Sequence, residues 1–204
     1  MTKIKLCGLT RECDIKWANE LMPEYIGFVF YPKSSRYVSF ERARELRRNL
    51  DSDITPVGVF VNEKIENIEH LLSCGTIGMV QLHGNENGAY IKLLKSRVTS
   101  PVIQAFRIET EADIKRAEES LADYVLLDSG GGTGQIFNHK LINGIKRKFF
   151  LAGGLDGENV KKAIMNLRPY GVDASSSLEI CGVKDRDKMA EFVSAVRYGN
   201  GGKK

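Results

Sequence analysis

Four side chains capable of acid–base chemistry or anion binding follow short apolar runs in this 204-residue chain. Cys7, His83 and Asp128 each come at the end of such a run, and Arg36 lies in the loop beyond another. A thiolate can take a proton and a carboxylic acid can give one, so a facing pair of these groups could move protons within one substrate. The planar guanidinium of Arg36 could bind a substrate carboxylate through two hydrogen bonds.

The apolar runs recur at a regular interval, which indicates a repeated structural unit. The steps between their first residues are 22 to 31 residues long. The runs begin near Lys3, Tyr25, Pro56, Gly78, Val102, Tyr124, Lys148 and Gly171. A parallel strand needs a return connection of a dozen or more residues, so about 23 residues hold one strand, one helix and two short loops. Eight such units predict an α/β fold, the single-domain (β/α)8 TIM barrel, in a compact version because the usual barrel has about 250 residues.

The composition favours one barrel domain over residues 1–198. Hydrophobic residues make up 42% of the chain and charged residues 27%, which is enough apolar material for a sizeable core. Residues 199–204 read Gly-Asn-Gly-Gly-Lys-Lys and contain nothing to bury, so we predict a flexible C-terminal tail there.

The sequence argues against several other classes of protein. No run approaches the roughly 20 apolar residues of a membrane span, and the first residues lack a signal-peptide core, so we expect a cytoplasmic protein without a membrane partner. The net charge is +4, but Lys and Arg are mixed with Asp and Glu in the helical segments, so we expect solvated helix faces and no nucleic-acid partner. The four cysteines form no C-x-x-C pair, which argues against a metal site and favours free thiols.

The first predicted strand would place Cys7 inside the barrel. Side chains alternate between the two faces of a strand, so Ile4 and Leu6 would face the helices while Lys5 and Cys7 face inward. A nearby ammonium group favours a thiolate over a thiol, so Lys5 predicts a partly ionised Cys7. The alternative is a core thiol, the commoner state of a buried cysteine.

Two polar residues mark the starts of the helices behind the first and second strands. Thr10 and Ser39 both carry the side-chain oxygen that caps a helix N-terminus, and a helical pattern follows each of them. We therefore predict N-caps at these two positions.

The loops that follow the strands gather at one end of a TIM barrel, where the active sites of such enzymes lie. Gly153 and Gly154 follow the seventh run, and Ser175 and Ser176 follow the eighth. Small residues let the backbone approach a ligand closely, so the N–H groups of these loops could bind a phosphate. Ordinary turn glycines and a serine-rich helix cap are the alternative interpretation. The glycine-rich segment 130–134 could close over a ligand.

Each candidate side chain also has a purely structural interpretation. Asp128 could cap the loop that follows its strand, or it could donate a proton. Arg36 could be an exposed loop residue instead of a carboxylate ligand. For His83, a structural or ligand-contacting role is favoured over direct catalysis.

Seven short motifs follow one another along nearly the whole chain. They are Lys5-Leu-Cys7-Gly8-Leu-Thr10, Gly27-Phe-Val-Phe30 with Ser34-Ser-Arg36-Tyr37, Val57-Gly-Val-Phe60-Val-Asn62, Gln81-Leu-His83-Gly84, Leu127-Asp128-Ser with Gly132-Thr-Gly134, Leu151-Ala-Gly153-Gly154-Leu155, and Gly171-Val-Asp173. In residues and in order, this set closely resembles the phosphoribosylanthranilate isomerase family, the single-domain barrel of tryptophan biosynthesis.

The resemblance implies a reaction and a role for each candidate residue. The family converts N-(5-phosphoribosyl)anthranilate to 1-(2-carboxyphenylamino)-1-deoxyribulose 5-phosphate, an Amadori rearrangement without metal or organic cofactor. By this resemblance Asp128 protonates the ring oxygen of the sugar, Cys7 takes the proton from ribose C2, and Arg36 holds the anthranilate carboxylate. The other implied contacts are Gly153, Gly154, Ser175 and Ser176 with the phosphate, and His83 and Asp173 with the rest of the substrate. The partner is then this phosphorylated small molecule, and the chain could be a monomer or a homodimer.

The chain departs from the family pattern after the eighth predicted strand. The third residue of the family's Ser-Ser-Gly is Ser177 here, and the segment 179–185 lacks the usual proline and is one residue shorter. The departure affects the expected phosphate loop, whereas Cys7 and Asp128 are both present.

Three alternative functions remain at this point. A related sugar isomerase of histidine biosynthesis uses carboxylates, including one at the end of the first strand, where this chain has Cys7. A metal-dependent pentose-phosphate epimerase would need His and Asp ligands from several strand ends, and His83 is the only histidine in such a place. A phosphate-binding barrel without catalytic activity would need neither Cys7 nor Asp128, so the isomerase is favoured.

Overall fold

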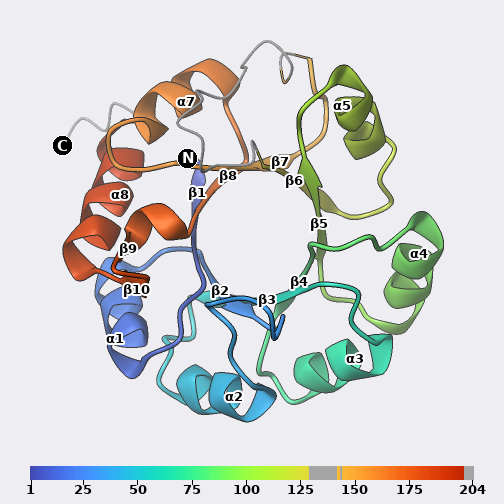
Figure 1. Cartoon of the computed structure of the whole chain (residues 1–204), viewed down its shortest axis with the longest axis horizontal. Coiled ribbons are helices and arrows are strands. Elements are labelled where there is room, and N and C mark those ends of the chain that lie inside the picture. Colours follow the sequence, from blue (N-terminus) through green and yellow to red (C-terminus); the bar gives the residue numbers. More distant parts are fainter. Residues whose placement is uncertain (129–141, 143, 200–204) are drawn as a thin grey trace.

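A computed structural model describes residues 1–128, 142 and 144–199 of the chain. Within these ranges the chain forms a closed barrel of eight parallel strands with helices packed around the outside (Figure 1). The predicted (β/α)8 TIM barrel is therefore confirmed. None of the helices in the described ranges is long and apolar enough to span a membrane.

Each barrel strand begins within one residue of the position predicted from the apolar runs. The strands are β1 (Lys3–Cys7), β2 (Tyr25–Val29), β3 (Thr55–Phe60), β4 (Met79–Leu82), β5 (Val102–Arg107), β6 (Tyr124–Asp128), β7 (Phe149–Ala152) and β8 (Gly171–Ala174). The helices in the described ranges are α1 (Glu12–Leu21), α2 (Phe40–Arg48), α3 (Ile65–Ser73), α4 (Gly88–Arg97), α5 (Glu111–Glu118), α7 (Val160–Leu167) and α8 (Arg186–Gly199). Between β8 and α8 lie a 3₁₀ turn, η1 (Ser176–Leu178), and a small antiparallel sheet of β9 (Glu179–Ile180) and β10 (Val183–Lys184).

Two sequence predictions fall largely on residues outside the described ranges. Helix α8 ends at Gly199, the first residue of the predicted tail, and residues 200–204 are not described. The glycine-rich segment 130–134, predicted to close over a ligand, is also not described.

The first and last strands of the barrel pair with each other and close the sheet. β1 and β8 run parallel, with Lys5 opposite Asp173 and Leu6 opposite Ala174. Every strand of the barrel therefore has a neighbour on both sides, and this sheet has no open backbone edge. The register also brings Lys5 and Asp173 to the same level of the barrel.

Two separate apolar clusters confirm the alternation predicted for the first strand. Ile4 and Leu6 belong to the large cluster between the sheet and the helices. Lys5 and Cys7 are buried on the other side of the same strand, inside the barrel. The inner cluster consists of Val57, Met79, Ile103, Leu126, Phe150 and Ala152.

Aromatic rings fill the barrel near the beginnings of its strands. The ring of Phe150 meets those of Tyr25, Tyr124 and Tyr170 edge to face, with ring centroids 5.4 to 5.8 Å apart. Tyr25 and Tyr124 are the first residues of β2 and β6, so this end of the barrel is packed. Space for a ligand is therefore left at the carboxyl ends of the strands.

One of the two predicted helix caps is correct. Ser39 caps α2, because its side-chain oxygen accepts a hydrogen bond from the backbone N–H of Arg42 at 3.1 Å. The Thr10 prediction is wrong, since α1 begins at Glu12. The carboxylate of Asp14 accepts hydrogen bonds from the N–H groups of both Thr10 and Arg11, at 2.9 Å each, and so makes Arg11 the capping position.

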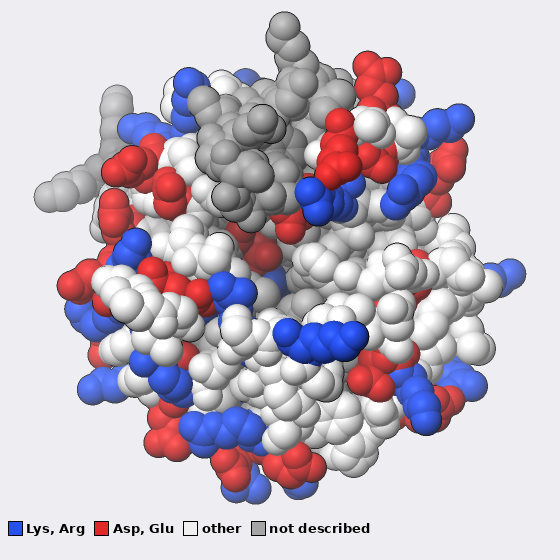
Figure 2. Space-filling model, viewed as in Figure 1, with Lys and Arg blue, Asp and Glu red and all other residues white. Residues whose placement is uncertain are grey.

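Charged side chains are spread over the visible surface. In Figure 2, Lys and Arg lie among Asp and Glu around the rim of the barrel, without a single basic patch on this face. Neighbouring helices are linked by ion pairs, such as Arg186 of α8 with Glu20 of α1 at 3.0 Å. This distribution is typical of the solvated helix faces expected from the sequence.

Candidate active site

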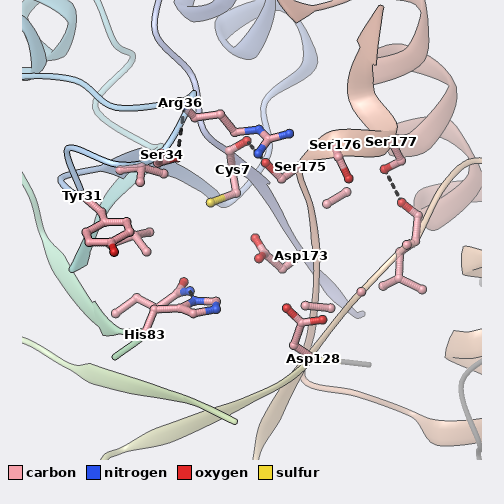
Figure 3. Close-up of a pocket in the computed structure, with 18 of the residues that line it drawn as sticks. Cys7, Tyr31, Ser34, Arg36, His83, Asp128, Asp173, Ser175, Ser176 and Ser177 are labelled. Carbon is pink, nitrogen blue, oxygen red and sulfur yellow. Dashed lines mark hydrogen bonds between the residues drawn. The ribbon is translucent and has the colours of Figure 1, made fainter. Parts of the chain in front are cut away.

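The carboxyl ends of the strands surround a cavity of about 310 Å³ (Figure 3). Figure 2 shows a hollow at the centre of the barrel, with acidic and basic side chains inside it. Every residue predicted for the site lines the cavity, namely Cys7, Arg36, His83, Asp128, Gly153, Gly154, Asp173, Ser175 and Ser176. The barrel brings these residues together because the loops after all its strands open at the same end.

Cys7 and Asp128 reach the cavity from strands that are not neighbours. Cys7 ends β1 and Asp128 ends β6, and the order of the sheet places β8 and β7 between them. In Figure 3 the sulfur of Cys7 and the carboxyl group of Asp128 both point into the cavity, with Asp173 between them in this view. Cys7 is buried and Asp128 is half-buried. Because both side chains line one cavity, a single ligand can contact both.

A buried ion pair lies directly beside Cys7. The Nζ atom of Lys5 donates a hydrogen bond to Oδ1 of Asp173 at 2.8 Å, and the Lys5 side chain is completely buried. Gly27 leaves room for this arrangement, because a Cβ atom there would lie 2.6 Å from the Cys7 sulfur and 3.2 Å from Lys5 Nζ. The thiol and the ammonium group are therefore close neighbours on the inner side of the barrel.

Burial affects the protonation of Cys7 more strongly than its charged neighbours do. Burial raises the pKa of the Cys7 thiol, the positive charge of Lys5 lowers it, and the negative charge of Asp173 raises it. The resulting pKa of Cys7 lies above its ordinary value. Burial alone would lower the pKa of Lys5, but Asp173 and Cys7 raise it overall, so the ammonium stays charged. The prediction of a partly ionised Cys7 is therefore wrong, because Lys5 is already paired and the buried sulfur is more stable as a thiol.

Arg36 is held by a carboxylate from the opposite end of the sequence. Its Nε and Nη2 atoms donate to Oε1 and Oε2 of Glu179, at 2.6 and 2.7 Å. These hydrogen bonds raise the pKa of Arg36, so the guanidinium is charged. The backbone N–H of Arg36 donates to the hydroxyl of Ser34 at 3.1 Å, which fixes the loop after β2 (Figure 3).

The segment that departs from the family pattern forms the β9–β10 hairpin. Cys181 and Gly182 connect the two strands with positive φ angles of 51° and 79°, as in the two-residue turns that suit tight hairpins. Glu179 and Lys184 stand opposite each other in the register, and Lys184 Nζ donates to Glu179 Oε1. Sequence reasoning missed both residues as parts of the site.

The two loops predicted to bind phosphate lie on one side of the cavity and are linked to each other. Gly153 and Gly154 have φ angles of 96° and 64°, a conformation that residues with a Cβ atom rarely adopt. Ser177, the departure from the family's glycine, donates a hydrogen bond from its hydroxyl to the backbone carbonyl of Leu155 (Figure 3). Its own φ is not positive, so the backbone there does not need glycine.

Gln81 is a third residue of the site that sequence reasoning missed. Its side chain is buried next to His83, with 3.0 Å between Gln81 Nε2 and His83 Nδ1. Gln81 Oε1 is buried without a hydrogen-bond partner among the described residues. The signal was present, because Gln81 precedes His83 by two residues and therefore shares its face of the strand.

Comparisons with known proteins agree with this geometry. The family described as N-(5'phosphoribosyl)anthranilate (PRA) isomerase matches residues 4–195. The N-(5'-phosphoribosyl)anthranilate isomerase of Endomicrobium trichonymphae is 44% identical over 202 residues, which are 97% of this chain and 99% of that protein.

Solved structures give the same result for the fold. The phosphoribosyl anthranilate isomerase of Thermotoga maritima has a TM-score of 0.88 and 37% identity, over 97% of this chain and 100% of that one. A phosphoribosyl anthranilate isomerase in complex with reduced 1-(o-carboxyphenylamino)-1-deoxyribulose 5-phosphate has a TM-score of 0.86 and 36% identity, with the same coverage. Since the family matches almost the whole chain and its members are similar from end to end, this chain belongs to the phosphoribosylanthranilate isomerase family.

Proposed function

We propose that this chain converts N-(5-phosphoribosyl)anthranilate to 1-(2-carboxyphenylamino)-1-deoxyribulose 5-phosphate with Asp128 as general acid and Cys7 as general base. One observation supports this assignment above all. A single cavity is lined by Cys7, Asp128, Arg36 and both loops predicted to bind phosphate. A substrate with a carboxylate at one end and a phosphate at the other finds a suitable group for each end.

In the proposed reaction Asp128 donates a proton to the ring oxygen of the ribose. The bond between C1 and this oxygen breaks, and an iminium forms between C1 and the anthranilate nitrogen. Cys7, as thiolate, then takes the proton from C2, and the electrons of that C–H bond form the C1–C2 double bond and neutralise the nitrogen. The resulting enolamine gains a proton at C1 and loses one from the C2 hydroxyl, which leaves the ketone.

The raised pKa of Cys7 fits the role of a base that acts beside a cation. The iminium places a positive charge next to C2, and a nearby positive charge favours the thiolate over the thiol. The thiol of Cys7 therefore releases its proton to solvent when the iminium forms, and the resulting thiolate takes the proton from C2. A thiolate with a raised pKa is also the stronger base toward a carbon-bound proton.

The remaining residues of the cavity hold the substrate in this proposal. Arg36 binds the anthranilate carboxylate, and the backbone N–H groups of the two loops bind the phosphate. His83 and Asp173 also line this cavity and contact the sugar in this proposal. A relative at 36% identity binds the reduced form of the proposed product, which carries both charged groups.

Turnover of N-(5-phosphoribosyl)anthranilate without added metal tests the two catalytic roles. Cys7→Ala and Asp128→Asn are each expected to lower kcat by roughly 10²- to 10⁴-fold, the usual contribution of a general acid or base. The affinity of both variants for reduced 1-(o-carboxyphenylamino)-1-deoxyribulose 5-phosphate should change little. Each variant keeps the fold and the groups that bind the carboxylate and the phosphate of this ligand. Cys74→Ala and Asp187→Asn, at exposed positions, serve as matched controls. If either active-site variant keeps the wild-type kcat, the role assigned to that residue is wrong.

A further inference from the structure

The Arg36 side chain is fixed along its whole length. Glu179 accepts two hydrogen bonds from the guanidinium, at 2.6 and 2.7 Å. The aliphatic stem of Arg36 passes close to Gly8, where a Cβ atom would lie only 2.5 Å from Arg36 Cδ. The guanidinium therefore has one orientation at the edge of the cavity.

Glu179 occupies one side of this guanidinium and leaves its end available. An arginine side chain has five N–H groups, and Glu179 takes the one on Nε and one of the two on Nη2. Among the described residues, none accepts a hydrogen bond from Arg36 Nη1. The N–H groups of Nη1 and Nη2 that remain form a second fork, which matches the two oxygens of another carboxylate.

Glu179 is itself held in place from the other side. Lys184 Nζ donates to Glu179 Oε1, and it also donates to the backbone carbonyl of Ser175 at 2.9 Å. The side chains of Glu179 and Lys184 are 7% and 1% exposed. Burial alone would raise the pKa of Glu179, but the hydrogen bonds from Arg36 and Lys184 lower it overall, so Glu179 is a carboxylate.

Lys184 also sets the net charge of the group formed by Arg36, Glu179 and Lys184. Glu179 alone would cancel the charge of Arg36. With Lys184 present, two cations and one anion leave one net positive charge. Arg36 is the exposed member of the group, with 27% of its side chain accessible, so a ligand anion meets this charge at Arg36.

We propose that Glu179 is a positioning residue for substrate binding, which turns the free end of Arg36 toward the substrate carboxylate, and that Lys184 holds Glu179 in this place. The inference rests on the function proposed above, in which Arg36 binds that carboxylate. Because Lys184 also binds the loop at Ser175, the β9–β10 hairpin ties the carboxylate end of the site to its phosphate end. Ser175 is further tied to β1, since its hydroxyl donates to the backbone carbonyl of Cys7 at 3.0 Å.

Two ligands distinguish positioning from a general structural role. The first is reduced 1-(o-carboxyphenylamino)-1-deoxyribulose 5-phosphate, and the second is the same compound without its carboxyl group. Glu179→Gln keeps the shape of the side chain but removes its charge and one acceptor. The substitution also adds one net positive charge to the group, but we expect the lost orientation of Arg36 to outweigh it. Binding of the first ligand should therefore weaken by about tenfold, the scale of one charge-assisted hydrogen bond, and binding of the second by less than about twofold, whereas tighter binding of the first ligand would overturn the positioning role.

A cycle of variants then ties the effect to Arg36. In an Arg36→Met background, Glu179→Gln should not change the ratio of the two affinities any further. Glu179→Asp retains the charge and should recover part of the lost preference for the carboxylate. Glu45→Gln, which removes a carboxylate paired with Arg42 on the surface of α2, is the matched control and should leave both affinities unchanged.

The outcomes separate this inference from the function on which it rests. Equal weakening of both ligands by Glu179→Gln, or the same loss in the Arg36→Met background, would overturn the positioning role while leaving Arg36 as the carboxylate ligand. A wild-type protein that binds both ligands equally well, or an Arg36→Met variant with an unchanged preference, would overturn the role of Arg36 itself and the positioning role with it.

Discussion

Two groups of charged side chains border the cavity, and they differ in net charge and in exposure. Lys5 and Asp173 form a neutral pair inside the barrel, with side chains that are 0% and 10% exposed. The group of Arg36, Glu179 and Lys184 has one net positive charge and an accessible end at Arg36. A neutral, enclosed pair has nothing to offer an anionic ligand, so its effect is on the neighbouring Cys7. The second group can bind an anion because one charge is left uncompensated.

The same structural arrangement produces both groups. Lys5 stands opposite Asp173 in the β1–β8 register, and Glu179 stands opposite Lys184 in the β9–β10 hairpin. Directly opposed residues on neighbouring strands lie on the same face, so each register makes an ion pair. The difference arises from Arg36, which joins only the second pair.

Breaking the enclosed pair should have the largest effect on stability. Lys5→Met leaves Asp173 buried without a partner, which is expected to lower the free energy of unfolding by about 3–5 kcal/mol. The double variant Lys5→Met/Asp173→Asn should recover more than half of this loss. Arg36→Met should cost only about 1 kcal/mol, because Glu179 keeps its bond to Lys184.

Urea unfolding of these three variants at neutral pH measures the difference. If Lys5→Met lowers the free energy of unfolding no more than Arg36→Met does, then the enclosed pair contributes no more to stability than the accessible group, and this prediction is wrong.

The close packing around the enclosed pair can be tested at Gly27. Gly27→Ala places a methyl group 2.6 Å from the Cys7 sulfur, so the sulfur has to move. Overpacking of this kind costs about 1–3 kcal/mol of unfolding free energy, and we expect kcat to fall more than the affinity for the product analogue. Thermal unfolding and steady-state kinetics give both quantities.

Gly88→Ala is the matched control for this substitution. A Cβ atom at Gly88 would be 3.6 Å from Leu121, an ordinary contact, so stability should change by less than about 0.5 kcal/mol. A Gly27→Ala variant that resembles Gly88→Ala in stability and kcat would show that the sulfur has room to move.

The pH dependence of kcat/KM should also distinguish the Lys5–Asp173 pair from the group of Arg36, Glu179 and Lys184. This is the smallest of the expected effects. Lys5 lowers the pKa of Cys7 more strongly than Asp173 raises it, so Lys5→Met/Asp173→Asn, which removes both charges, raises this pKa further. Since the base acts as thiolate, the loss of kcat/KM on the acidic side should begin at a higher pH than in the wild type. Glu179→Gln should lower kcat/KM without moving this limb. If the acidic limb shifts in Glu179→Gln but not in the double variant, then the Cys7 pKa depends on the group of Glu179 and not on the Lys5–Asp173 pair.

The fold and most of the site could be predicted because they depend on short-range patterns. The repeat length located the strands, and the period of two in the first strand placed Lys5 and Cys7 on the inner side. Once the barrel was recognised, Arg36 and Asp128 were expected to line the same cavity, since the loops after parallel strands lie at one end of the barrel.

The protonation of Cys7 and the partner of Arg36 could not be predicted in this way. A pKa shift is the balance of burial against charges from several strands, and a spacing along one strand shows only which charges are near. Arg36 and Glu179 are 143 residues apart, so no local pattern joins them. Thr10 failed as a cap for a related reason, because the Asp14 carboxylate accepts from the N–H groups of Thr10 and Arg11 and the helix begins one residue later than expected.

The pairing of β1 with β8 also bears on how the protein is made. Synthesis begins at the N-terminus, so β1 has only one neighbour until the residues of β8 have left the ribosome. During that time the growing sheet has two open edges, which can pair with other chains or be covered by a chaperone. Asp173, Glu179 and Lys184 emerge after all the residues of β1 to β7. A nascent chain that has stopped before Gly171 therefore has neither a closed barrel nor a complete substrate site.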